Sequence, residues 1–277
     1  MTIPLIELLK VLIIGIVEGV TEWLPISSTG HMLLVDEFIR LEAGESFKEM
    51  FFVVIQLGAI LAVVVLFWKK MWPFYRREGK IAAKPETFSL WAKVVVACIP
   101  GAVIALLFDD WIDAHLTTPA VISLALVIYG VGFIVVERWN KTRSPRILKL
   151  EEISYPVALQ IGLFQVLSII PGTSRSGATI IGALILGVSR VAAAEFTFFL
   201  AVPVMFGLSI LKLLKFGFQF TAPELTILLV GMVSAFLVSW AVIRFLMNYI
   251  RKHDFQAFGV YRICLGVILL IYFLLIK

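Results

Sequence analysis

Two glutamates in a strongly apolar stretch, Glu18 and Glu22, are the first residues of this chain whose types and spacing suit chemistry. They are four residues apart, so a helix would place both carboxylates on one face. A carboxylate at the middle of a bilayer costs on the order of 3 kcal/mol. The pair suits a divalent cation, because Mg²⁺ is commonly held by one or two carboxylates together with substrate phosphates. An acid–base pair and a purely structural hydrogen-bonding pair are the alternatives.

A run of hydroxyls follows these glutamates. Ser27, Ser28 and Thr29 come after a proline that ends the first apolar segment, and His31 comes two residues later. A hydroxyl here can cap a second helix, whose free N–H groups attract anions. If Ser28 is the cap, His31 can reach its hydroxyl, and this is the minimal pair for an activated nucleophile. The alternative is plain capping beside a buried, hydrogen-bonded histidine.

A second polar segment, residues 171–179, places an arginine among hydroxyls. Arg175 is flanked by Ser174 and Ser176, and Thr179 lies one turn further on. The planar guanidinium matches phosphate or carboxylate oxygens, and a helix start adds to the same preference. The segment is not a Walker P-loop, because it has no Gly-x-x-x-x-Gly-Lys. The alternative is a structural ion pair between the arginine and a carboxylate of the first segment.

Together these residues predict phosphoryl transfer on a membrane substrate. That reaction needs a cation or an arginine to neutralise phosphate oxygens, and a positioned nucleophile. A phosphate site inside an apolar protein implies a lipid phosphate as the substrate. Arg262, near the start of the last apolar stretch, is either a phosphate contact or an arginine that snorkels to the membrane surface.

The two polar segments resemble one another at a constant spacing of about 147 residues. Ser27 falls on Ser174, and Gly30 falls on Gly177. Paired apolar segments that are interrupted by glycine and proline, at matching places in two halves, indicate a site near the bilayer midplane. The sequence therefore predicts two related halves.

The composition is that of a polytopic membrane protein. The chain is 61% hydrophobic and only 16% charged, with a mean hydropathy of +1.01, whereas a soluble domain is nearer half apolar and a quarter charged. The net charge of +5 comes from loops and does not indicate nucleic acid as a partner. Six apolar stretches are long enough to span a membrane, at about 51–68, 90–108, 119–137, 193–213, 222–243 and 258–276.

The segments 5–40 and 157–188 do not fit as ordinary spans. Each has a first arm of roughly 15 residues, which as a helix reaches only about 22 Å of a core about 30 Å thick. We expect re-entrant helical hairpins there. The predicted fold is an all-α polytopic membrane protein, with six transmembrane helices plus two re-entrant hairpins in one domain, 1–277. Two inverted-topology repeats, 1–140 and 150–277, would each hold one hairpin and three spans.

The loop charges predict the orientation. Most of the 24 basic residues lie in loops 69–89, 138–156, 188–192 and 244–257, whereas the 109–118 loop is acidic. The positive-inside rule places the basic loops in the cytoplasm and both termini outside. Three spans in each half invert the second half relative to the first, so the two hairpins would come from opposite sides and meet at their tips. The first hairpin comes from outside, which favours an outward-facing site.

Two motifs identify a family. Residues 18–31 and 171–180 closely resemble the two signature motifs of the bacterial undecaprenyl-diphosphate phosphatase family, also called the bacitracin-resistance protein, and the resemblance covers essentially the whole chain. It implies an enzyme of the bacterial inner membrane that hydrolyses undecaprenyl diphosphate to undecaprenyl phosphate and phosphate. Such an enzyme recycles the carrier lipid for peptidoglycan synthesis and confers bacitracin resistance. The resemblance also implies a divalent cation, Mg²⁺ or Ca²⁺, membrane lipids as surroundings, and a homodimer.

The resemblance carries residue roles onto the matching positions. The expected catalytic residues are Glu22, Ser28, His31 and Arg175; the expected metal ligands are Glu18 and Glu22; the expected substrate contacts are Ser27, Thr29, Ser174, Ser176, Thr179 and Arg262. Attack by Ser28 with His31 as its base, and direct attack by water, are both consistent with this set. The competing class is a transporter or flippase for lipid phosphates, because inverted repeats with broken helices are also the plan of secondary transporters.

Overall fold

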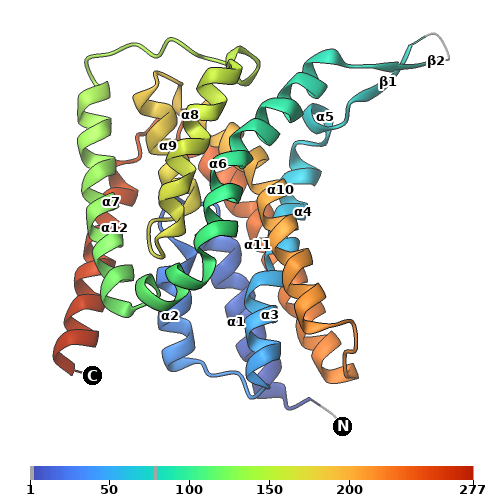
Figure 1. Ribbon diagram of the computed structural model, residues 1–277, viewed down its shortest axis with the longest axis vertical. Coiled ribbons are helices and arrows are strands. Elements are labelled where there is room, and N and C mark those ends of the chain that lie inside the picture. The colour runs from blue at the N-terminus through green and yellow to red at the C-terminus, as the bar shows by residue number, and fades with distance from the viewer. Residues whose placement is uncertain (1–2, 78–79, 277) are drawn as a thin grey trace.

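The computed structural model describes residues 3–77 and 80–276 as a bundle of helices (Figure 1). Within these residues, six helices are long and apolar enough to cross a membrane, so the chain is a multi-pass membrane protein and the six predicted spans are confirmed. The first, Glu45–Leu66, comprises α3 (Glu45–Val54) and α4 (Gln56–Leu66). The others lie in α6 (Pro85–Leu116), α7 (Pro119–Asn140), α10 (Arg190–Phe216), α11 (Ala222–Tyr249) and α12 (Gln256–Ile271), which continues as η3 (Tyr272–Ile276).

Three of the predicted loops contain regular structure. The 69–89 loop holds most of α5 (Trp68–Met71) and an antiparallel hairpin of β1 (Phe74–Arg77) and β2 (Lys80–Ala83); residues 78–79 lie outside the described part. The 109–118 loop is wrong, because α6 continues to Leu116. The 138–156 loop contains the short η1 (Leu150–Glu152). Hydropathy marks where a run of apolar residues ends, whereas backbone hydrogen bonds can continue a helix beyond that residue. The acidic side chains at 109, 110 and 113 lie outside the described residues.

Four shorter helices flank the two polar segments. They are α1 (Leu5–Thr21), α2 (Ser28–Phe38), α8 (Tyr155–Val166), which continues as η2 (Leu167–Ile169), and α9 (Arg175–Ile185). The predicted breaks are therefore confirmed as breaks in helical structure. Pro25 lies in the first, and Gly172, with φ of +91°, lies in the second, where a side chain would be strained. The longest of the four has 17 residues, which is short for a membrane-spanning helix.

Glycines let the helices approach closely. A Cβ atom on Gly162 of α8 would lie 2.3 Å from the backbone oxygen of Ala97 in α6. Gly15 of α1 packs against α11 in the same way, and Gly130 of α7 meets Gly259 of α12. Small residues at helix contacts are typical of membrane bundles. Each short first helix thus packs on a long helix from the other half of the chain: α1 on α11, and α8 on α6.

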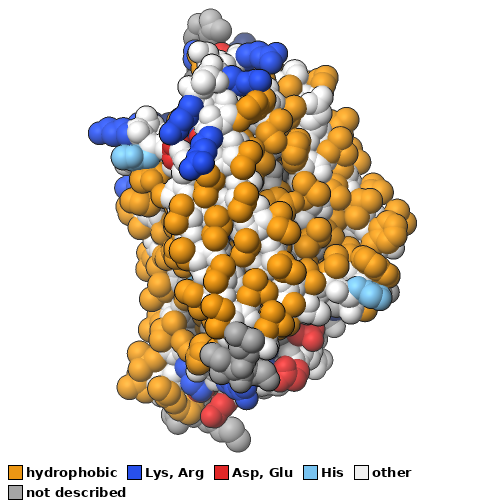
Figure 2. Space-filling view, turned by 90° about the vertical axis from the view of Figure 1, so that its left-hand side faces the viewer, with side chains coloured by type: hydrophobic (Ala, Val, Ile, Leu, Met, Phe, Trp, Pro, Cys, Tyr) orange, Lys and Arg blue, Asp and Glu red, His pale blue; other side chains and the backbone are white. Residues whose placement is uncertain are grey.

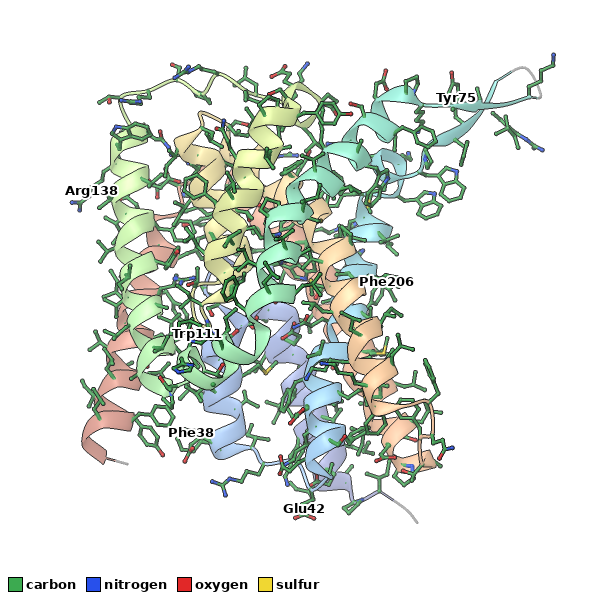
Figure 3. All side chains as sticks on the ribbon, viewed as in Figure 1. Phe38, Glu42, Tyr75, Trp111, Arg138 and Phe206 are labelled. Atoms are coloured by element: carbon green, nitrogen blue, oxygen red, sulfur yellow. The ribbon has the colours of Figure 1, made fainter. Side chains whose placement is uncertain are left out.

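The outside of the bundle is apolar, and its two ends differ. Figure 2 shows a broad hydrophobic band on one face, with Lys and Arg gathered at the upper end. α1 begins and α12 ends at the lower end, whereas the hairpin that carries Tyr75 projects from the upper end (Figures 1 and 3). Leu106 is 81% exposed in a helix, which a lipid surrounding explains.

Candidate active site

Both polar breaks form the same strained helix start. Ser27 caps α2 with φ of 72°, and Ser174 caps α9 with φ of 73°. The Ser27 Oγ accepts the N–H of Gly30 at 3.5 Å, and the Ser174 Oγ accepts the N–H of Gly177 at 3.1 Å. A left-handed backbone at a residue other than glycine costs on the order of 1–3 kcal/mol and is typical of functional sites. Ser27 is therefore the cap, and Ser28 is the first residue of the helix.

An ion pair joins the two breaks. The Arg175 guanidinium donates through Nη2 to the Glu22 Oε1 at 2.9 Å and through Nη1 to the Thr197 carbonyl at 3.0 Å. The side chains of Arg175 and Glu22 are 12% and 10% exposed, so the pair is largely screened from solvent. The ion pair between Arg175 and a carboxylate of the first segment, which was the structural alternative in the sequence analysis, is therefore present. It brings predicted residues of both segments into one site.

Ser28 contacts Glu22 rather than His31. The Ser28 hydroxyl donates to the Glu22 Oε2 at 2.9 Å. The His31 Nδ1 lies 2.8 Å from the Ser27 carbonyl, and its Nε2 lies 2.7 Å from the Tyr261 hydroxyl. Because a carbonyl can only accept, Nδ1 carries the proton of the neutral ring, and Nε2 accepts from the tyrosine. The group that is placed to take a proton from Ser28 is therefore Glu22.

The hydroxyls of the second break form a network around this ion pair. The Thr179 Oγ1 lies 2.9 Å from the Thr197 Oγ1, and the Ser174 Oγ lies 3.0 Å from the Ser176 Oγ. Ser176 also donates to the backbone oxygen of Glu22 at 3.4 Å. These contacts fix the start of α9 against the first break. Of the predicted substrate contacts, Thr29 is exposed on the first turn of α2.

Arg262 ties the two breaks together from α12. Its side chain is fully buried, so the snorkelling interpretation is wrong. Its Nη2 donates to the carbonyls of Gly172 and Thr173, both at 2.9 Å, and its Nη1 donates to the Pro25 carbonyl at 3.3 Å. Because these donors are already used by backbone oxygens, Arg262 positions the two breaks relative to each other.

Glu18 is the one carboxylate of the site with an unused oxygen. It is 1% exposed, and its Oε1 has no hydrogen-bond partner among the described residues. Both oxygens of Glu22 are engaged, by Arg175 and by Ser28. No cluster of three or more His, Cys, Asp or Glu side chains occurs in the described part of the chain. This donor set fits a hard cation that takes its remaining ligands from substrate oxygens and water.

Two residues of the site were not predicted from the sequence. Thr197 and Tyr261 lie in long apolar helices and contact Thr179 and His31. Thr197 stands between Phe196 and Phe198, and all three are fully buried. A polar residue inside a membrane-spanning stretch is a functional candidate by default, and that signal could have identified both.

Known proteins are similar to this chain over almost its whole length. The model of the family described as "Bacitracin resistance protein BacA" matches residues 11–268. Proteins named undecaprenyl-diphosphatase from Enterococcus faecalis, Desulfitobacterium hafniense and Lachnoclostridium phytofermentans are 65%, 60% and 59% identical to this chain. The matches cover 98%, 97% and 98% of this chain, and 99%, 97% and 99% of the three relatives. The family that the two motifs indicate is thereby confirmed: this chain belongs to the bacitracin resistance protein BacA family.

Proposed function

We propose that this chain is a membrane phosphatase that hydrolyses undecaprenyl diphosphate to undecaprenyl phosphate and inorganic phosphate. The ion pair between Arg175 and Glu22 carries the proposal, because it joins an arginine, a carboxylate and, through Ser28, a hydroxyl in one buried site. The names of the three relatives support it, and none of those names indicates transport. Recycling of the carrier lipid and bacitracin resistance follow from this activity, since the antibiotic sequesters the diphosphate.

Arg175 is the proposed anchor of the terminal phosphate. Its Nη2 donates to Glu22 in the structure, and a phosphate oxygen can replace that carboxylate as the acceptor. The N–H groups at the start of α9 favour the same anion. Ser174, Ser176 and Thr179, and the helix start of α2 with Ser27 and Thr29, complete the proposed substrate surface. Release from the arginine frees the Glu22 Oε1 for the cation, while its Oε2 stays on the Ser28 hydroxyl.

In the proposed reaction, the Ser28 Oγ forms a bond to the terminal phosphorus while the bridging P–O bond breaks. The hydroxyl proton moves to the Glu22 Oε2, which lies 2.9 Å away, and undecaprenyl phosphate leaves. Water then attacks the phosphoserine, the Ser28 oxygen regains a proton, and inorganic phosphate is released. Direct attack by a water that gives its proton to Glu22 is the rival, and a trapped phosphoserine would decide between them.

We propose that Glu18 and Glu22 hold a divalent cation, Mg²⁺ or Ca²⁺. The free Oε1 of Glu18 supports this assignment. Such a cation would neutralise charge on the phosphate oxygens. Chelation should therefore remove activity, and returning the cation should restore it.

We also propose that α1–α2 and α8–α9 are re-entrant hairpins of two inverted repeats, 1–140 and 150–277. The matching φ values at Ser27 and Ser174 support the repeat, and so does the exchanged packing of α1 on α11 and α8 on α6. The basic loops would face the cytoplasm, with the termini and the mouth of the site on the outer side of the inner membrane. The assembly expected from the family resemblance is a homodimer.

Phosphate release from undecaprenyl diphosphate by the purified protein in detergent tests the function. Arg175→Ala should abolish release, whereas Arg138→Ala, an exposed arginine at the end of α7, should leave it unchanged. Equal release by both variants would refute the assignment of the site. Absence of release by the folded wild-type protein, with the cation supplied, would refute the function.

A further inference from the structure

A cavity lies away from the candidate active site. It has a volume of about 560 Å³ and is formed by the end of α7, the loop that follows it, the turn between α9 and α10, and the end of α11. Arg138, labelled in Figure 3, marks this upper end of α7. Glu18, Glu22, Ser28 and Arg175 are not among its lining residues. We call this cavity the basic pocket.

Arginines supply most of the charged groups in its lining. Arg143, Arg146, Arg190 and Arg251 line the pocket, against the single carboxylate of Glu137. That carboxylate is fully buried and already neutralised: it accepts from the Arg190 Nε at 2.9 Å and from the backbone N–H of residue 255 at 3.0 Å. In the described part of the chain, Arg143, Arg146 and Arg251 pair with no carboxylate. The pocket therefore carries uncompensated positive charge.

The pocket is held in shape by bonds between its walls. The backbone N–H groups of Arg146 and Ile147 donate to the Gly187 carbonyl at 2.8 and 3.1 Å. The Ser189 N–H returns a bond to the Ile147 carbonyl at 2.8 Å. The Arg143 guanidinium lies 3.7 Å from the centre of the Trp139 ring, a cation–π contact. The loop that carries the arginines is thus tied to the turn opposite.

Basic residues continue beyond the pocket. An adjoining cavity of about 500 Å³ shares Asn140, Arg143 and Arg190 and adds Lys141 and Lys252. Its one carboxylate, Asp254, accepts two hydrogen bonds from Gln256. Figure 2 shows a cluster of Lys and Arg side chains at this end, above the hydrophobic band. A ligand here would have its charged part among arginines and its apolar part along the band.

We propose that the basic pocket binds the phosphate group of an anionic phospholipid. Arginine forks match phosphate oxygens. Basic pockets between membrane helices at a cytoplasmic surface suit anionic head groups, and the positive-inside rule assigns this basic end to the cytoplasm. Leu184, Ile185 and Val191 supply an apolar wall. Free phosphate would satisfy the arginines equally but would leave that wall unused, which favours the lipid.

Native mass spectrometry of the purified full-length chain tests the proposal. The chain is titrated with phosphatidylglycerol, with phosphatidylcholine of the same acyl chains, and with inorganic phosphate. Arg143→Gln/Arg146→Gln should raise the Kd for phosphatidylglycerol about 30-fold, which is about fivefold for each charge. The control Arg76→Gln/Lys80→Gln removes two charges from the β-hairpin and should change the Kd less than about twofold.

Several results would overturn it. An equal loss in both double variants would reduce the effect to general surface charge, and equal affinity for phosphatidylcholine would remove the role of the phosphate charge. Inorganic phosphate binding as tightly as phosphatidylglycerol would make this a free-phosphate site. If the double variant does not fold, Arg251→Gln serves in its place, with about a fivefold rise expected. Hydrolysis by each variant in neutral detergent should match the wild type, which checks folding at the other site.

Discussion

Substitution of Glu22, the carboxylate that contacts Ser28, tests whether Glu22 or His31 is the base. Glu22→Gln keeps the size of the side chain but removes its charge, so the Ser28 hydroxyl loses its proton acceptor and Arg175 loses its counter-ion. His31→Gln removes the imidazole that the motif suggested as the base. In the structure that imidazole bonds to the Ser27 carbonyl and to Tyr261. The two substitutions should therefore differ in size of effect.

A general base contributes about 10²–10⁴ in rate. We expect Glu22→Gln to lower kcat by at least about 100-fold, and His31→Gln to lower it by about tenfold, through loss of positioning. Because the Glu22 and Arg175 side chains are only 10% and 12% exposed, Glu22→Gln should also lower the free energy of unfolding by about 1.5–3 kcal/mol. Initial rates of phosphate release at saturating substrate, together with thermal unfolding in detergent, measure both effects. An equal or larger rate loss in His31→Gln would refute the assignment of Glu22 as the base.

Three further substitutions test the surrounding structure. Tyr261→Phe removes the 2.7 Å bond to His31 and should lower kcat several-fold with about 1 kcal/mol or less of lost stability; unchanged kinetics would show that this bond positions nothing. Arg262→Met strips three backbone carbonyls of their donor and should lower stability by at least about 2 kcal/mol; a melting temperature within one degree of the wild type would contradict its role as a tie between the breaks. Gly162→Ala should cost about 1–3 kcal/mol, because its Cβ would lie 2.3 Å from the Ala97 oxygen, whereas Gly207→Ala, with open space around it, should cost nothing; similar melting temperatures for both would argue against close packing of α8 on α6.

Hydropathy and the positions of proline and glycine predicted most of the fold. The six spans are long apolar runs, and Pro25 and Gly172 mark both breaks. The ends of the helices were harder to predict, because α6 continues to Leu116 through polar residues that hydropathy excludes from a span. The strands at 74–77 and 80–83 were missed because their charged sequence has no apolar alternation to indicate strands.

Motif spacing found the residues of the site but not their pairing. Glu22 and Arg175 were both candidates, and the structure joins them. The hydrogen bond between Ser28 and Glu22 depends on the turn at residues 22–27, which reverses the chain and brings Ser28 back to the Glu22 carboxylate. A helical count from Ser28 leads instead to His31, three residues on. Tyr261 reaches His31 across 230 residues, a contact that only the packing of α12 could reveal.

Hydrolysis in ¹⁸O-labelled water tests the central claim most directly. The purified wild-type chain, supplied with Mg²⁺, would be given undecaprenyl diphosphate, and both products would be quantified with their isotope content. The account predicts equal amounts of undecaprenyl phosphate and inorganic phosphate, with the label in the inorganic phosphate alone and neither product formed by Arg175→Ala. Intact lipid diphosphate recovered from the folded wild-type protein, or label found in the undecaprenyl phosphate, would contradict it.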